Sequence, residues 1–525
     1  MKRLILAMLV ISLLPLDAQE RGRAKKRVGT NQRLSRNVVA GTDADLAQAL
    51  QLAKAGRYAE ASQRLFQLSY SPRFRDRRMQ IKYILGMTLH QMKLNQVSAF
   101  QFIGVVKDGN NKYVKQSLER LSLAADALGD DTLLNYAISR VNVDEFPRVH
   151  RDMLYFRIGE YQMRNKQFGE AAQNFSRVGR GSSLFSSAKY QQGLAHAEAG
   201  QTDDALAAFE NLIQARASQP ATDKSKVAGM MGKARTLYQR KNWDEAIEAY
   251  RQVPRDTEFW HDTLFESSWA MLRSGRFRSA LSNFHSLHSS FYEDQYLPES
   301  LLLRSIVYLY ICKYDEMDKV LTLFNRTYKP VYKQINKTLE TVDKPDRYFN
   351  LMNDMMKVAK KDSGADRMSM PIPYLVAQKI SREPDFQNVF QYIRRLIEEK
   401  KRINALSGGW GSSAVGQYSK KVLNTRLAKA KQRAGKIVRN HLLTIREELV
   451  DLIEQEGFAR YEMINGRKEF LKKRIAGKEL PEQQIDETTQ RDFYIQNGYE
   501  YWPFRGEYWL DELGNYHYVG TQSCN

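Results

Sequence analysis

The chain has 525 residues, of which 81 are Lys or Arg and 60 are Asp or Glu, so its formal net charge is +21. Its length allows two or three domains, and two cysteines exclude a disulfide-rich framework. No P-loop, nucleophile elbow or dinucleotide-binding glycine fingerprint is present, so the common sequence signatures of catalysis are missing.

Residues 1–18 have the layout of a secretory signal peptide. Lys2 and Arg3 are basic, residues 4–16 are an apolar run, and cleavage is expected after Ala18. The run is too short to span a membrane comfortably. Because no cysteine follows the cleavage position, we expect no lipid anchor there. The mature chain is predicted to be soluble and periplasmic, with peripheral association with the outer membrane as an open alternative.

The positive charge persists in the mature chain, where removal of residues 1–18 leaves +20. Outside the cytoplasm a basic surface meets acidic protein segments, anionic lipid or wall polymers, so no nucleic acid is expected as a partner. Residues 19–41 follow as a basic arm, with seven Lys or Arg and no acidic residue between Arg21 and Arg36. This arm is predicted to be disordered, and it is either a solvated linker or a tether to an anionic surface.

A spacing recurs along residues 42–325: a small residue, then Ala twelve positions later, then an aromatic residue or Leu sixteen positions later. The clearest sets are Gly159, Ala171 and Phe175; Gly193, Ala205 and Phe209; Ala234, Ala246 and Tyr250; and Ser268, Ala280 and Phe284. Looser sets begin at Ala49, Gly86, Ala125 and Ser305, which gives about eight units 34 to 41 residues apart. Such a period predicts antiparallel helical hairpins stacked into a solenoid, with small residues at the helix crossings and each aromatic filling the gap to the next unit.

These units resemble tetratricopeptide repeats (TPRs), most closely in residues 243–247 (WDEAI) and 168–172 (FGEAA). The resemblance covers residues 42–325 and implies an all-α solenoid that binds other proteins. The first helices of the units carry Tyr155, Arg157 and Arg235. A groove of this composition suits an acidic peptide, and it equally suits water.

Residues 326–382 read as an irregular helical connector with several prolines, and residues 383–475 as a helical hairpin or coiled coil. Phe386, Val389, Phe390, Ile393 and Ile397 recur at helical spacing. The glycine-rich residues 407–413 then break the pattern before a long second helix begins.

Charge is sorted along this hairpin, because residues 400–446 hold twelve Lys or Arg and no Asp or Glu. The residues proposed to bind a partner are Lys421, Arg426, Lys429, Arg433, Lys436 and Arg439. They form either a docking surface for an acidic partner or a plain solvated face. If they dock a partner, a chain without residues 383–525 should keep folded repeats and lose its place in a complex.

Residues 476–525 form an aromatic C-terminal module, with ten aromatic residues between Phe493 and Tyr518. Alternation and glycine turns predict a small antiparallel β-meander. Trp502, Phe504 and Trp509 either anchor an interface or cap the helical region with a compact core. Cys312 is expected in an apolar helix as a buried hydrophobe and Cys524 at the surface, with a disulfide between them, or between two copies of Cys524, as alternatives.

Residues 501–516 (YWPFRGEYWLDELGNY) resemble the ending of envelope TPR proteins of the adventurous gliding-motility machinery. The order of signal peptide, repeats, helical region, aromatic ending and final cysteine is also the same. This resemblance implies a non-enzymatic periplasmic scaffold that binds the other envelope proteins of a multiprotein complex. A TPR adaptor in outer-membrane or cell-wall biogenesis is the alternative, and an enzyme with its site in the C-terminal module is a weaker third.

No catalytic residue, cofactor site or metal site is predicted. His285 and His288 lie three positions apart, as a metal pair could, but no Cys or carboxylate cluster completes the set nearby. The expected fold is therefore all-α, a TPR-like solenoid followed by a long helical hairpin, with a small β-rich aromatic ending.

Overall fold

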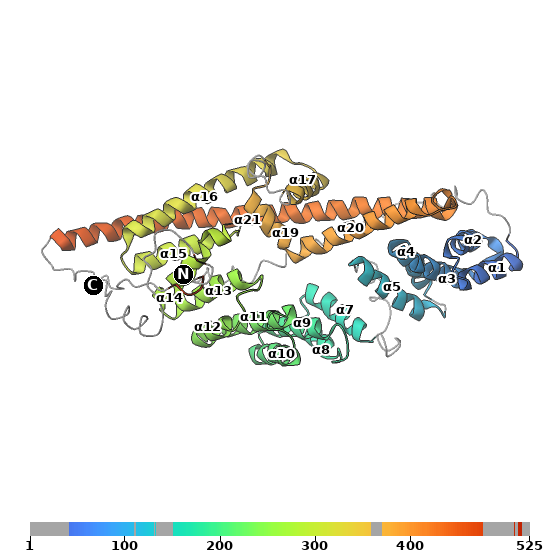
Figure 1. Ribbon diagram of the computed structural model, residues 1–525, viewed down its shortest axis with the longest axis horizontal. Helices are drawn as coiled ribbons and strands as arrows, with labels where there is room; N and C mark the ends of the chain where they lie inside the picture. The colour runs from blue at the N-terminus through green and yellow to red at the C-terminus, as the bar shows by residue number, and fades with distance from the viewer. Residues whose placement is uncertain are drawn as a thin grey trace. The chain divides into compact units, whose positions relative to one another are not determined.

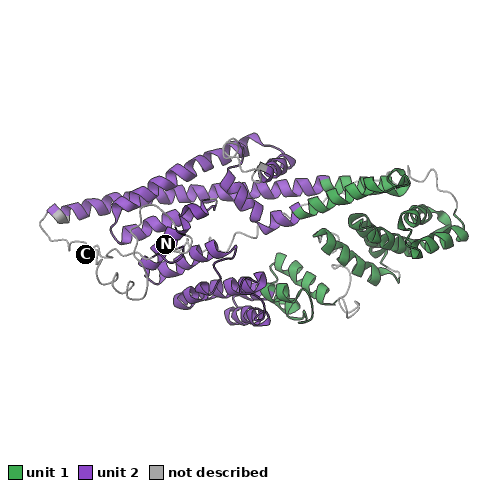
Figure 2. Ribbon diagram, in the orientation of Figure 1, with its two compact units in different colours: residues 1–191, 391–427 green, residues 192–390, 428–525 purple. Residues whose placement is uncertain are grey.

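The computed structural model describes residues 41–109, 112–130, 132, 151–293, 295–358, 370–475, 509 and 513–516. Regular structure in these residues is α-helix with short 3-10 turns, and they contain no β-strand (Figure 1). The predicted β-meander lies almost entirely outside them, as do the signal peptide and nearly all of the basic arm. The chain divides into two compact units, residues 1–191 with 391–427 and residues 192–390 with 428–525 (Figure 2).

Unit 1 begins with helical hairpins that pack in chain order. They are formed by α1 (Asp43–Lys54) with α2 (Tyr58–Tyr70), α3 (Arg78–Gln91) with α4 (Asn95–Asp108), and α7 (Arg151–Arg164) with α8 (Phe168–Ser176), while α5 (Val114–Leu128) packs on α4. The chain starts α1 with a reciprocal capping box, in which Thr42 and Asp45 satisfy each other's backbone N–H groups. α9 (Phe185–Glu198) contains the boundary between the units.

Unit 2 is built in the same way, from helices that pack on one another in chain order. Its helices are α10 (Thr202–Ala215), α11 (Lys224–Gln239), α12 (Trp243–Arg251), α13 (Trp260–Arg273), α14 (Phe277–Leu287), α15 (Pro298–Tyr310) and α16 (Tyr314–Thr341), each packed on the next. Gly200 and Gly275 join the helices of two hairpins at φ 75° and 74°, a left-handed conformation that glycine adopts without strain. The helical solenoid predicted from the sequence is therefore confirmed.

The recurring aromatic residue packs on small residues from two successive hairpins. The Phe209 ring lies against Gly193, where an added Cβ would be 2.6 Å from a ring carbon, and also against Gly232 of the following hairpin. Ala205, Phe209 and Ala246 are all fully buried. The prediction that the aromatic fills the gap to the next unit is confirmed here, because this ring belongs to both packing layers.

Two details differ from the expected layout of the connector. The boundary expected at residue 325 falls inside α16, which runs unbroken through Pro330 to Thr341. Cys312 is not in a helix: α15 ends at Tyr310, and Cys312 lies half-buried in the following turn with φ 56°. It is disulfide-bonded rather than a free buried thiol, and Cys524, the one other cysteine of the sequence, lies outside the described residues.

The predicted helical hairpin is present and is formed by α20 (Pro384–Ala405) and α21 (Ala414–Ile475), which lie side by side (Figure 1). Gly408 and Gly409 adopt φ 68° and 67° in the turn between them, followed by the 3-10 turn η6 (Trp410–Ser412). In unit 2, Asp385 near the start of α20 accepts hydrogen bonds from His441 of α21 at 3.0 Å. The helices α17 (Pro345–Val358) and α19 (Tyr374–Arg382) pack on each other and precede the hairpin.

Candidate functional site

The basic residues predicted on α21 divide into exposed and packed ones. Lys429, Arg433 and Lys436 lie at i, i+4 and i+7, so they share one exposed face of the helix within unit 2. The other side of the same stretch packs on the start of α17, where Gly435 lies against the backbone of Pro345. This separation of faces leaves Lys429, Arg433 and Lys436 exposed in one short row.

The remaining predicted residues of the hairpin take different roles. Lys421 is exposed, whereas Arg426 is half-buried with its guanidinium 4.8 Å from the centre of the Phe100 ring. Arg439 is exposed and lies near Tyr348, where burial raises the pKa of the Tyr348 hydroxyl and the charge of Arg439 opposes that rise. Arg426 therefore contributes to packing within unit 1, and its role in binding a partner stays a prediction.

The three candidates on the first helices of the repeats already have partners within the chain. Arg157 forms ion pairs with Asp126 and with Glu160, the latter at 2.9 Å, and its side chain is only 14% exposed. Arg235 binds Glu266 through two hydrogen bonds of 2.8 and 2.7 Å. The Tyr155 ring is covered by a guanidinium, from Arg177. An acidic peptide would have to displace these carboxylates, so the groove is less open than its composition suggests.

The aromatic ending contributes one exposed candidate among the described residues. Trp509 is 59% exposed, whereas Trp502 and Phe504 lie outside the described residues. A turn four residues later docks on the last repeats, where Leu513 is buried and the Gly514 N–H donates to Ser286 at 2.7 Å. Tyr516 packs edge-on against His285. Short pieces of the ending therefore pack on α14, as the alternative of a structural cap expects.

No local pattern in the sequence predicts that the tip of the hairpin packs on the repeats of unit 1. Trp410, at the tip of the hairpin, is fully buried, and its indole N–H donates to Ser62 of α2 at 2.9 Å. On the following helix, Tyr418 packs its ring 5.3 Å from that of Phe66. The only sequence signal was a tryptophan between two glycines, which looked like part of a flexible turn. The turn is instead anchored on α2, the second helix of the first repeat.

A buried carboxylate makes the second contact of this dock. Glu399 of α20 is 2% exposed and accepts hydrogen bonds from the backbone N–H groups of Gln96 at 2.9 Å and Val97 at 3.2 Å. These N–H groups belong to the first turn of α4, which lacks a side-chain cap of its own. Burial raises the pKa of Glu399 to about 7, against these hydrogen bonds and the charge of Arg402, which lower it.

This pKa predicts a pH dependence of stability. Since the pKa of Glu399 is about 7 in the folded chain and 4.5 ordinarily, the folded state holds the proton more tightly between these values. Its contribution to stability is therefore present below about pH 4.5 and is lost as pH rises towards 7. We expect Glu399→Gln to flatten the decline of the free energy of unfolding over this range, as measured by urea unfolding at a series of pH values.

Burial and the nearby Glu448 raise the pKa of Glu299 to about 7 as well. The free energy of unfolding of Glu399→Gln should therefore still decline somewhat over this pH range. Glu398→Gln is the matched control, because this neighbouring carboxylate is exposed. If the free energy of unfolding changes with pH as steeply in Glu399→Gln as in the native chain, the buried carboxylate does not titrate in this range.

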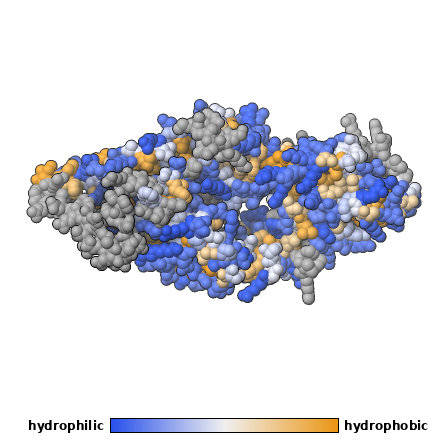
Figure 3. Space-filling view, in the orientation of Figure 1, coloured by the Kyte–Doolittle hydropathy of each residue, from blue (hydrophilic) through white to orange (hydrophobic). Residues whose placement is uncertain are grey.

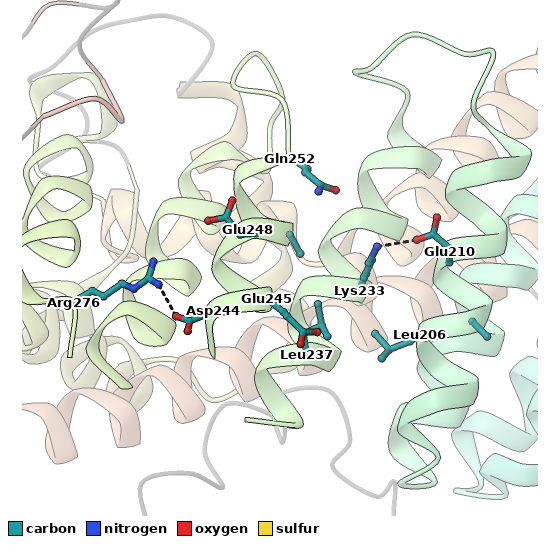
Figure 4. A pocket seen from close by; sticks show the side chains of 11 residues that line it. Leu206, Glu210, Lys233, Leu237, Asp244, Glu245, Glu248, Gln252 and Arg276 are labelled. Atoms are coloured by element: carbon teal, nitrogen blue, oxygen red, sulfur yellow. Dashed lines mark hydrogen bonds and ion pairs between the residues drawn. The ribbon is translucent and has the colours of Figure 1, made fainter. Parts of the chain in front are cut away.

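Unit 2 has a pocket lined mainly by residues of α10, α11 and α12 (Figure 4). Its volume is about 710 Å³, and Leu206, Leu237 and two alanines form its apolar part. Charged side chains surround it, with Lys233 paired to Glu210 at 2.9 Å and Arg276 paired to Asp244 at 2.7 Å. Glu245, Glu248 and Gln252 complete the lining, which carries more acidic than basic side chains although the chain as a whole is strongly basic.

The described residues contain neither a candidate metal-binding group of side chains nor a candidate membrane-spanning helix. They contain no group of three His, Cys, Asp or Glu placed to hold a metal ion. His288 is buried, with one ring nitrogen 2.8 Å from Ser300 and the other 3.1 Å from Arg304. None of their helices is both long and apolar enough to cross a bilayer. The face in Figure 3 is predominantly hydrophilic, with apolar residues in scattered groups.

Comparison with known proteins agrees with the hairpin geometry. Residues 190–258, which include α10, α11 and α12, match the tetratricopeptide repeat family. The repeats are TPR-like. One similar solved structure contains nearly identical TPR-like repeats of a Podosopora anserina protein described as a kinesin light chain, with 15% identity, a TM-score of 0.30 and coverage of 34% of this chain and 96% of that one. No curated protein matches the chain.

TPR-like arrays generally hold other proteins rather than catalyse reactions, because their stacked hairpins present extended surfaces. The match and the fold thus support a protein-interaction scaffold. The narrower resemblance to gliding-motility proteins has no support in these comparisons.

Proposed function

We propose that this chain is an exported, non-enzymatic scaffold that holds proteins of an envelope-spanning complex, with the gliding-motility machinery as the specific candidate. The signal-peptide layout of residues 1–18 and the resemblance of residues 501–516 support the location and the process. The TPR-like repeats support the role of binding proteins. The repeats alone fit an adaptor in outer-membrane or cell-wall biogenesis equally well. Only the resemblance of residues 501–516 favours the gliding-motility complex.

The observation that carries the binding role is the exposed basic row Lys429, Arg433 and Lys436 on α21. An acidic protein segment is the matching partner, since like charges from the rest of this basic chain repel cationic ones. Contacts of this kind are exposed and therefore screened by salt within about 8–10 Å.

Reversal of these three charges to Glu is expected to weaken association with the complex by roughly tenfold or more at low salt, and the difference should shrink as salt rises. The measurement is crosslinking and pull-down from the envelope of the source organism, with the mature N-terminus sequenced from the same sample. An N-terminus near Gln19 in the envelope fraction is expected, and an intact Met1 in the cytosol would contradict export.

A matched control exists on α16, where Lys329, Lys333 and Lys337 are exposed at i, i+4 and i+8 in the same unit. Their reversal to Glu changes the net charge by the same amount. Equal loss of association in both triple variants would show that only total charge matters, and the basic row on α21 would then not be the docking surface.

A further inference from the structure

The pocket of unit 2 occupies the same repeat positions as the hairpin dock of unit 1. Ala61, Ser98, Ala205 and Ala246 hold equivalent places in their hairpins, twelve residues after the small residue that begins each set. By this register Leu206 of α10 corresponds to Ser62 of α2. On the next second helix, Asp244, Glu245 and Glu248 of α12 correspond to Gln96, Val97 and Phe100 of α4.

All four unit 1 positions contact the chain's own hairpin. Ser62 accepts from Trp410, Gln96 and Val97 donate their backbone N–H groups to Glu399, and Phe100 lies under the guanidinium of Arg426. Gln96 also accepts a hydrogen bond of 2.5 Å from the Tyr392 hydroxyl. Two α-helices thus lie across the second helices of consecutive repeats, so this face of the repeat can receive a helix.

The equivalent positions in unit 2 are open to solvent. Ser62, Gln96 and Val97 are at most 1% exposed under the hairpin, whereas Asp244, Glu245 and Glu248 are exposed and Leu206 is half-buried. Figure 4 shows these side chains around the hollow between α10, α11 and α12. Among the described residues, the repeats of unit 2 therefore present the surface that the hairpin covers in unit 1, and here no helix covers it.

The charges of this surface select a different occupant from that of unit 1. In unit 1 the docked helix brings a carboxylate, Glu399, to the N-terminus of α4. At the N-terminus of α12, Asp244 and Glu245 already supply negative charge, which the helix dipole favours there. A helix that docks at α12 must therefore bring cations. The nearest partner of Glu248 is Arg251, in an exposed pair that is worth little and is easily exchanged.

We propose that this pocket binds an amphipathic basic helix of a partner protein, with its apolar stripe on Leu206 and Ala207 and its Lys or Arg residues beside Glu245 and Glu248. The site is distinct from the basic row on α21 and of opposite charge, so it goes beyond the function proposed above. The chain would then hold acidic segments on one surface and a basic helix on another, as a scaffold that brings two classes of partner together can.

The test uses the mature full-length chain and a labelled amphipathic peptide of about 18 residues, roughly five helical turns, made of Leu and Lys with one Trp. Fluorescence anisotropy is expected to show binding that Glu245→Lys with Glu248→Lys weakens by about tenfold or more. Both side chains are exposed, so the fold should persist, and circular dichroism checks this. A peptide with Glu in place of Lys should not bind at this pocket, so any binding that it shows should be unchanged in the pocket variant and weakened by the triple charge reversal on α21.

Asp256→Lys with Glu293→Lys is the control, because both residues are exposed in unit 2, lie outside the pocket and change the net charge equally. Equal weakening in both double variants, or none in the pocket variant, would overturn the proposal. A native chain that dimerises while the pocket variant stays monomeric would assign the pocket to a second copy instead. The triple reversal on α21 should leave peptide binding intact, so failure of the envelope function and failure of this site are separable.

Discussion

Replacement of Trp410 by Ala is expected to lower the free energy of unfolding by about 3–5 kcal/mol, the range for removal of a large buried aromatic side chain. The indole is fully buried at the hairpin tip and its N–H donates to Ser62 at 2.9 Å. A cavity there removes packing from α2 and from the turn at once. Because Trp410 and Glu399 belong to one dock, amide hydrogen exchange should accelerate in α2 and α4 as well as around the tip.

Urea unfolding followed by circular dichroism measures the first effect, and hydrogen exchange resolved by peptide measures the second. Trp410→Phe is the matched control, since it keeps an aromatic ring and removes the N–H donor, a loss of about 1 kcal/mol. If Trp410→Ala unfolds at the same urea concentration as the native chain and α2 keeps its protection, the hairpin does not stabilise the repeats.

A charge introduced at position 246 should lower the stability of unit 2 about as much as Trp410→Ala lowers that of unit 1. Ala246 is fully buried in α12, which packs on both α11 and α13. Ala246→Asp places a carboxylate at a fully buried position, so we expect a loss of several kcal/mol of stability. Because neighbouring hairpins share one core, thermal unfolding followed by circular dichroism should show the loss across the flanking repeats.

Ala428→Asp is the control for this variant, because Ala428 is exposed on α21 and the same substitution there buries no charge. It is expected to change stability by no more than about 0.5 kcal/mol. An Ala246→Asp chain that melts as the native one does would mean that position 246 is not at a helix crossing and that the assigned register is wrong, along with the equivalence of the pocket and the dock.

The repeat architecture could be predicted because its determinants are local. Hairpin turns, a small residue at each crossing and an aromatic sixteen positions later fix how each unit packs, as Gly193 and Phe209 illustrate. The break before Trp410 and the long helix after it follow from the same kind of local pattern. Helical periodicity and glycine turns are properties of short segments, which a single sequence displays directly.

The hairpin dock could not be predicted, because it joins residues about 300 positions apart. Glu399 and Gln96 are separated by 303 residues, and no local pattern shows that a carboxylate on one helix caps another. The partners of Arg157 and Arg235 were missed for a similar reason. Each is a residue on a neighbouring first helix, so composition alone made the groove look like an open basic surface.

The dock also alters what truncation should do. From sequence, removal of residues 383–525 was expected to leave the repeats intact. In unit 1 that deletion takes away Trp410 and Glu399, and it leaves the first turn of α4 without its cap. We therefore expect the first repeats of such a chain to be weakened, and loss of localisation would not by itself identify the docking surface.

The same dock places a constraint on the order in which the chain can become native. The first two hairpins cannot complete their packing until residue 410 has been synthesised, and closing so long a loop is slow compared with forming a local hairpin. Until then the chain lacks a finished N-terminal core. If the chain is exported as proposed and is threaded unfolded through a translocation channel, this delay is an advantage, because the segment that enters first is the one whose folding waits for the last quarter of the chain.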